Sequence, residues 1–375
     1  MDVSLQVLGE RGRGDVRIGT HLVVVGHTEG NDVVVRGQNA TAADFAGAAL
    51  GLAPQQQPRL VERVEVSRVL VDARVVDGPG NPILGLGRDD FYVKIDGKTA
   101  RVESVQWIAG DSNETNGGVL DSTSIRGAVS PPPDGRLIVL LFQKSLEKPR
   151  IVGLMRMLIE LRKFLETLTP NDRVAVLSFD SHLKIWVDFT NDLRRVRPVL
   201  QRGILFERPG PVQTAPPPSL VAGLDPARAR RASTIEEALR LIGEALEPLP
   251  GSKSLVFVGH GFGELGLMGV SMVNRYEEAR QALQTARVSV FSLDVTEADY
   301  HSLEAGLQIV ANDTGGFFER THILTERALS RLSGALAGHY VLFVEKPDLE
   351  SGTHRIKVEL TRATGTVMAR NRFVD

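Results

Sequence analysis

Residues 137–142 form an unbroken apolar run, Leu-Ile-Val-Leu-Leu-Phe, that stops abruptly at Gln143, Lys144 and Ser145. A short apolar run of this kind is typical of a buried strand. The polar loop after such a strand is where an α/β protein usually keeps its binding or catalytic groups. The run therefore indicates both a buried sheet and the place to look for a functional site.

Strands and helices alternate beyond this run. Strands are predicted at 173–180, 183–189, 254–260 and 288–294, and helices at 151–168, 233–249, 276–286, 302–313 and 323–337. The helix at 233–249 carries a capping box, with Ser233 as the N-cap and Glu236 three residues on. This alternation predicts an α/β fold with a doubly wound, mostly parallel sheet.

The segments on either side of this region are rich in β pattern instead. Residues 60–108 and 338–375 alternate apolar and polar side chains, as strands with one buried face do. Asp96-Gly97 is the strongest dipeptide signal for a hairpin turn. Neither segment can cover its own apolar faces, so we expect the two to form one β-sandwich in which the α/β domain is inserted.

These patterns also predict the domain boundaries. We expect a poorly ordered N-terminal segment at 1–59, the first part of the sandwich at 60–108, a polar linker at 109–134, an α/β domain at 135–337 and the second part of the sandwich at 338–375. Glycine-rich breaks and a QQQP run are the reason to expect poor order in the first segment.

Composition excludes several functional classes. A formal net charge of -2 and 5% aromatic residues argue against nucleic acid and anionic membranes as partners. The absence of cysteine excludes disulfides, thiol catalysis and cysteine-ligated metals. No apolar stretch reaches the roughly 18 residues that suggest a membrane span. The acidic opening Met1-Asp2-Val3 does not favour a signal peptide, so composition leaves localisation open.

Sequence blocks spread over residues 60–375 resemble the von Willebrand factor A (vWA) family, specifically bacterial VWFA-related proteins with β segments on both sides. The blocks are LGRDDFYVKIDGK, LIVLLFQKS, DRVAVLSFDS, VDFTND, STIEEAL, SLVFVGHG, VFSLD, ANDTGGFFE and HYVLFVEK. The resemblance implies a secreted or cell-envelope protein whose central sheet carries a metal-ion-dependent adhesion site at its C-terminal edge. Such a site needs an Asp-x-Ser-x-Ser loop, a Thr in a second loop and an Asp in a third, because Mg²⁺ prefers hard oxygen ligands.

The chain departs from that motif at both acidic positions. Gln143 stands where the first Asp belongs, and His260 stands where the third-loop Asp belongs. Ser145 matches the first Ser, whereas Glu147 stands at the second; Thr234 fits the second-loop Thr. We therefore expect a degenerate ligand site without a metal cofactor, formed by Gln143, Lys144, Ser145, Glu147, Thr234 and His260. The alternative is adhesion through a divalent ion such as Mg²⁺, held by Ser145, Thr234 and Glu147.

A second candidate surface lies in a long, Pro-rich loop that ends in the basic residues Arg228, Arg230 and Arg231. This group would favour an acidic ligand without a metal bridge, and a merely solvated insertion is the alternative interpretation. Together these features predict a non-enzymatic protein–protein interaction or adhesion-type module whose protein partner the sequence does not identify.

Two enzymatic interpretations compete with this prediction. The segment Gly261–Gly266 matches G-x-G-x-x-G after a strand, and Asp294 ends the next strand, as in dinucleotide-binding enzymes. Alternatively, Ser145 and His260 would be the nucleophile and base of a hydrolase, although the chain has no G-x-S-x-G elbow. A loop at the edge of a vWA-like sheet explains the same residues more simply.

Overall fold

The structure is a computed structural model that describes residues 24–28, 31–35, 68–110, 135–267, 269–272 and 274–374. The chain divides into two compact units, one of residues 1–64 and 117–131, the other of residues 65–116 and 132–375. The described part of the first unit is an antiparallel pair, β1 (Val24–Thr28) and β2 (Asn31–Val35). The rest of the segment predicted to be poorly ordered, and residues 111–134 of the predicted linker, lie outside the described residues.

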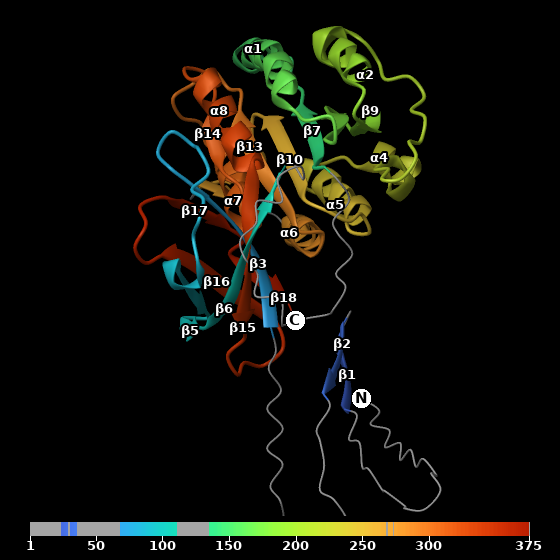
Figure 1. Ribbon diagram of the computed structural model, residues 1–375. Coiled ribbons are helices and arrows are strands. Elements are labelled where there is room, and N and C mark those ends of the chain that lie inside the picture. Colours follow the sequence, from blue (N-terminus) through green and yellow to red (C-terminus); the bar gives the residue numbers. More distant parts are fainter. Residues whose placement is uncertain are drawn as a thin grey trace, which may run out of the picture. The chain divides into compact units, whose positions relative to one another are not determined.

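A sheet of six strands forms the centre of the second unit (Figure 1). Its strand order is β14-β13-β10-β7-β8-β9, and all neighbours are parallel except the β8–β9 hairpin. The bounds are β7 Leu137–Gln143, β8 Arg173–Phe179, β9 Leu183–Thr190, β10 Lys253–Gly259, β13 Val288–Asp294 and β14 Phe318–Arg320. The predicted α/β class with a mostly parallel sheet is confirmed.

Helices cover both faces of this sheet, because its strands bury side chains on both faces. Val139 and Leu141 of β7 belong to one core, and Ile138 and Leu140 belong to the other. Helices α5, α6 and α7 contribute to the first core, and α1 and α8 to the second. The bounds are α1 Lys148–Phe164, α2 Leu193–Pro198, α3 Ile204–Phe206, α4 Pro226–Arg231, α5 Ile235–Leu246, α6 Asn274–Thr285, α7 Glu304–Thr314 and α8 Thr325–Leu336. None of the described helices is long and apolar enough to span a membrane.

Two antiparallel sheets of four strands each lie outside the central sheet, in the orders β17-β3-β15-β6 and β18-β16-β4-β5. The bounds are β3 Arg68–Val76, β4 Phe91–Ile95, β5 Lys98–Ala100, β6 Val102–Ala109, β15 Gly338–Glu345, β16 Thr353–Leu360, β17 Thr366–Ala369 and β18 Arg372–Val374. Each sheet combines strands from before and after the α/β region, so the two flanks interleave. Residues of both sheets, among them Val71, Val93, Leu342 and Ile356, share one hydrophobic core.

Local details both support and correct the predictions. Asp96 and Gly97 have φ angles of 47° and 82°, and they connect β4 to β5 as the predicted tight hairpin. The N-cap of α5 is Thr234, one residue later than predicted, because its hydroxyl accepts the Glu237 N–H. The alternating pattern at 365–374 predicts a single strand, but the segment splits into β17 and β18, which belong to different sheets.

The antiparallel sheets are tied to the α/β region by a buried arginine. Arg74 of β3 is 4% exposed, and it donates to the Ala335 carbonyl at 3.0 Å and to the Ser289 hydroxyl at 2.6 Å. Its guanidinium also lies over the Phe291 ring, and burial lowers the Arg74 pKa to about 10. The arginine thus bonds to a helix and a strand of the α/β region at once.

Candidate functional site

Five loops follow the carboxyl ends of the strands β7, β8, β10, β13 and β14, which are five parallel neighbours in the sheet. We call these loops, residues 144–147, 180–182, 260–273, 295–303 and 321–324, the exit edge. Because parallel strands all end at the same side of a sheet, the exit edge gathers residues that are far apart in the sequence. It is the candidate site of this fold.

The Gln143 side chain holds the start of the β10 loop in place within the exit edge, and we call this arrangement the Gln143 clamp. The side chain is 8% exposed, its Oε1 accepts the His260 N–H at 3.0 Å, and its Nε2 donates to the Gly261 carbonyl at 2.9 Å. Gly259 leaves room for this arrangement, because a Cβ there would lie 2.7 Å from Gln143 Oε1. Gln143 therefore bonds through both the oxygen and the nitrogen of its side-chain amide to the backbone of the β10 loop. An aspartate could not donate to the Gly261 carbonyl.

The structure brings two predicted site residues, Gln143 and His260, into direct contact. Burial and, to a smaller extent, the charge of Arg150 lower the pKa of His260 to about 4, so this imidazole is neutral near pH 7. Its Nδ1 is buried and has no hydrogen-bond partner within the described part of the chain. Burial also lowers the pKa of Lys144, whose N–H bonds to the Phe179 carbonyl at the end of β8.

The remaining residues of the predicted site are occupied by local interactions. The Ser145 hydroxyl accepts the Glu147 N–H at 3.2 Å, and the Glu147 carboxylate pairs with Arg150 at 3.0 Å. The Thr234 hydroxyl caps α5. All three oxygen ligands proposed for a divalent ion thus already take part in local interactions.

The glycine-rich segment forms a small hairpin. Strands β11 (Glu264–Gly266) and β12 (Gly269–Ser271) pair antiparallel, and helix α6 begins only at Asn274. A dinucleotide-binding turn needs its glycines to open directly onto a helix N-terminus, and these residues do not have that form. Gly261, at φ 102°, instead packs on the next loop, where an added Cβ would lie 2.2 Å from the Leu303 carbonyl oxygen.

The basic group lies on α4, where Arg228, Arg230 and Arg231 are exposed. Arg228 pairs with Glu244 of α5 at 2.9 Å. The long loop before α4 is anchored by Asp188, which is 1% exposed. The Asp188 carboxylate accepts the Ala215 and Leu220 N–H groups and the Ser219 hydroxyl, at 2.7, 2.8 and 2.6 Å. The Pro-rich insertion is therefore bonded to the sheet through a carboxylate that sequence analysis had no reason to select.

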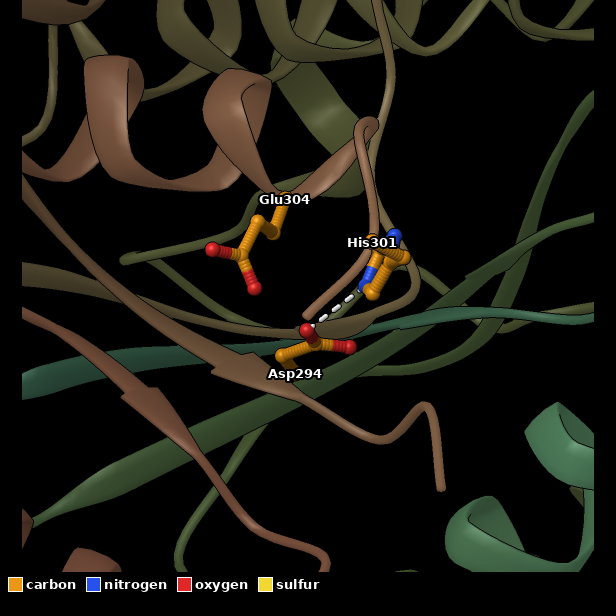
Figure 2. Close-up of side chains that lie close together, drawn as sticks. All are labelled: Asp294, His301 and Glu304. Carbon is orange, nitrogen blue, oxygen red and sulfur yellow. Dashed lines mark hydrogen bonds and ion pairs between the residues drawn. The ribbon is translucent and has the colours of Figure 1, made fainter. Parts of the chain in front are cut away.

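A cluster of two carboxylates and an imidazole also went unnoticed in the sequence. Asp294 ends β13, His301 lies in the loop that follows, and Glu304 begins α7; their ligand atoms all lie within 4.8 Å of one another. Figure 2 shows the three side chains converging, with His301 Nε2 2.7 Å from Asp294 Oδ2. The available signal was a strand-end aspartate followed by a His-x-x-Glu at helical spacing.

Large hydrophobic side chains are exposed along the exit edge. We call the set the apolar rim; it comprises Leu146, Leu265, Leu267, Tyr300, Ile323 and Leu324. These side chains come from four different loops, and Leu146 is 94% exposed. Scattered exposed hydrophobics are ordinary, but several on loops that share one edge are typical of an interaction surface.

No family model matches the chain, and no curated protein matches its sequence. Among solved structures, the human COPII-coat protein Sec24c is similar at 13% identity and a TM-score of 0.35, over 65% of this chain and 44% of that chain. The conserved hypothetical protein BatB from Bacteroides thetaiotaomicron is similar at 14% identity and a TM-score of 0.36, over 54% of this chain and 97% of that chain. The pilus tip protein Mfa5 from Porphyromonas gingivalis is similar at 10% identity and a TM-score of 0.33, over 71% of this chain and 55% of that chain.

Proposed function

We propose that this chain is a non-enzymatic protein-interaction module: a vWA-type domain with a degenerate adhesion site, inserted in a β-sandwich formed by the two antiparallel sheets. The observation that carries the proposal is the exit edge, where an apolar rim surrounds a family ligand site whose acidic positions are Gln143 and His260. The partner binds this edge by apolar contact and without a bridging metal at the family position.

Electrostatics at the family position support metal-free binding. Gln143 is neutral, the lowered pKa of His260 keeps it neutral near pH 7, and the Lys144 ammonium repels cations. A neutral hydroxyl such as that of Ser145 cannot outcompete water for Mg²⁺ without a carboxylate beside it. None of these three residues carries a negative charge, and Lys144 is a cation that can face an acidic group on the partner.

The arginines of α4 extend this preference. Arg230 and Arg231 are exposed, and they precede α5, whose N-terminus must lie toward the exit edge because α5 leads back to the start of β10. We therefore propose a partner with an apolar contact surface and an acidic margin. Replacement of Arg228, Arg230 and Arg231 by Glu is expected to abolish its capture.

The central test compares rim and control variants in affinity capture from the native host. The double variant Leu146→Ser, Leu267→Ser is expected to lose the partner that the unchanged chain retains, both with and without a chelator. Leu84→Ser is the matched control, because Leu84 is 62% exposed and lies in the antiparallel part of the chain. Equal capture by the rim and control variants would refute the proposed surface, and loss of capture by chelator alone would refute metal-free binding.

A further inference from the structure

The cluster of Asp294, His301 and Glu304 has the donor chemistry of a transition-metal site. One imidazole nitrogen and two carboxylates supply ligand atoms within 4.8 Å of one another. A tetrahedral ion with bonds of about 2.0–2.1 Å needs ligand atoms roughly 3.3 Å apart, so small side-chain rotations suffice to enclose one. All three ligands come from residues 294–304, a single strand end, loop and helix start.

Burial makes a cation favourable at this cluster. Asp294 is 0% exposed and Glu304 is 2% exposed, and buried carboxylates are costly unless a positive group or hydrogen bonds offset their charge. Arg320 is the positive group that pairs with Glu304, at 2.6 and 2.8 Å, and 39% of its side chain is exposed. Asp294 has the His301 ring on one oxygen and the Thr296 N–H on the other. Glu304 thus has one half-exposed arginine as its cationic partner, and among the described residues Asp294 has no arginine or lysine in ion-pair contact.

Two buried hydroxyls beside Asp294 give an independent indication of a missing ligand. Ser292 is 0% exposed and Thr296 is 7% exposed, and within the described part of the chain neither hydroxyl has a hydrogen-bond partner. Ser292 lies two residues before Asp294 on β13, so its side chain points to the same face of the sheet. Buried hydroxyls are normally bonded, and a hydrated ion next to Asp294 would supply bonded water to this face.

We propose that Asp294, His301 and Glu304 bind a divalent transition-metal ion, such as Zn²⁺ or Mn²⁺, at a site one strand removed from the family's adhesion site. The imidazole ligand favours these ions over Mg²⁺ and Ca²⁺, which prefer oxygen alone. Arg320 competes with the ion, because its positive charge repels a cation at Glu304 and its guanidinium donates to both Glu304 oxygens. A bound ion would link the two ends of the loop 295–303. This proposal does not depend on the proposed partner surface.

Calorimetric titration of the full chain with Zn²⁺, Mn²⁺ and Mg²⁺ tests the site. The unchanged protein is expected to bind one Zn²⁺ or Mn²⁺ per chain, with Mg²⁺ at least tenfold weaker. His301→Gln and Glu304→Gln are each expected to weaken Zn²⁺ binding at least tenfold. His322→Gln is the matched control, because His322 also pairs with an aspartate, Asp299 at 3.1 Å, but belongs to no three-ligand cluster among the described residues.

Arg320→Gln separates a metal site from a purely structural ion-pair network. It removes the competitor and leaves the ligands in place, so Zn²⁺ affinity is expected to rise about tenfold and the metal-induced rise in Tm to increase. Circular dichroism of each variant confirms that it is folded. Absence of stoichiometric binding by the unchanged chain, equal binding by His301→Gln and His322→Gln, or no gain in Arg320→Gln would each overturn the proposal.

Discussion

The clamp formed by Gln143 gives a prediction that a near-isosteric substitution can test. In Gln143→Glu, the N–H that bonds to the Gly261 carbonyl becomes an oxygen facing an oxygen, at a site that is 8% exposed. The lost hydrogen bond costs about 1 kcal/mol, and a buried carboxylate without a cation adds about 2 kcal/mol. We expect the free energy of unfolding to fall by about 3 kcal/mol at about pH 7.5.

The pH dependence of this loss identifies its cause. A charge penalty of about 2 kcal/mol corresponds to a rise of about 1.5 in the pKa of the introduced carboxyl group, to about 6. Because the folded-state pKa is raised, the penalty grows as pH rises through that value and is absent below the unfolded pKa. At about pH 4.5 the introduced carboxyl group is largely protonated and the charge penalty is nearly absent, so the loss should shrink to about 1 kcal/mol or less.

Urea unfolding followed by circular dichroism measures both values, with each variant compared with the unchanged chain at the same pH. Gln143→Met is the control: it leaves the His260 N–H and the Gly261 carbonyl unbonded, and it should lose about 2 kcal/mol at both pH values. A Gln143→Glu loss that is independent of pH, or smaller than about 0.5 kcal/mol, would refute the clamp.

Three further predictions concern other parts of the chain. The half-buried His260 and the buried His339 each have a pKa of about 4, below the unfolded value of about 6.5. Stability should therefore fall as pH drops from about 6.5 to about 4, by up to about 3 kcal/mol for each residue. A flat urea midpoint over this window would contradict this. Asp188→Ala should lower the free energy of unfolding by about 3–5 kcal/mol, because the loop loses the carboxylate that anchors it. Residues 207–219 should then become accessible to limited proteolysis. A variant that is not cleaved would show that the loop does not depend on this carboxylate. Gly153→Ala should destabilise the protein by about 2 kcal/mol, because the alanine Cβ would lie 1.8 Å from the Val295 carbonyl oxygen. An unchanged Tm would mean that α1 can shift away from Val295 without loss of stability.

The periodic pattern of apolar residues predicted much of the fold. The apolar run at 137–142 is buried on both faces, and the unburied faces of the two flanks led to their interleaving, because strands with one apolar side must find a partner. Periodicity could not show that residues 365–374 change sheets, since alternation continues across the short turn between β17 and β18. Sheet membership depends on long-range pairing, which a local pattern does not encode.

Only part of the candidate site could be predicted from the sequence. The predicted strands place Gln143 and His260 at strand ends, and the structure shows that these strands are neighbours, so that the two residues form a backbone contact. The role of Gln143 as a clamp depends on the space above Gly259, which is visible only in three dimensions. The convergence of His301 and Glu304 on Asp294 likewise depends on how the loop 295–303 folds back, and that path has no periodic signature.

The close packing of Gly261 on Leu303 limits how this protein can be altered. The Gly261 backbone packs directly against the Leu303 backbone, so the conformation of the β10 loop depends on that of the residues before α7. A segment transplanted from a homologue into either position would have to bring its counterpart with it. We therefore expect successful chimaeras to exchange residues 260–304 as one cassette, and evolution to replace the two loops together.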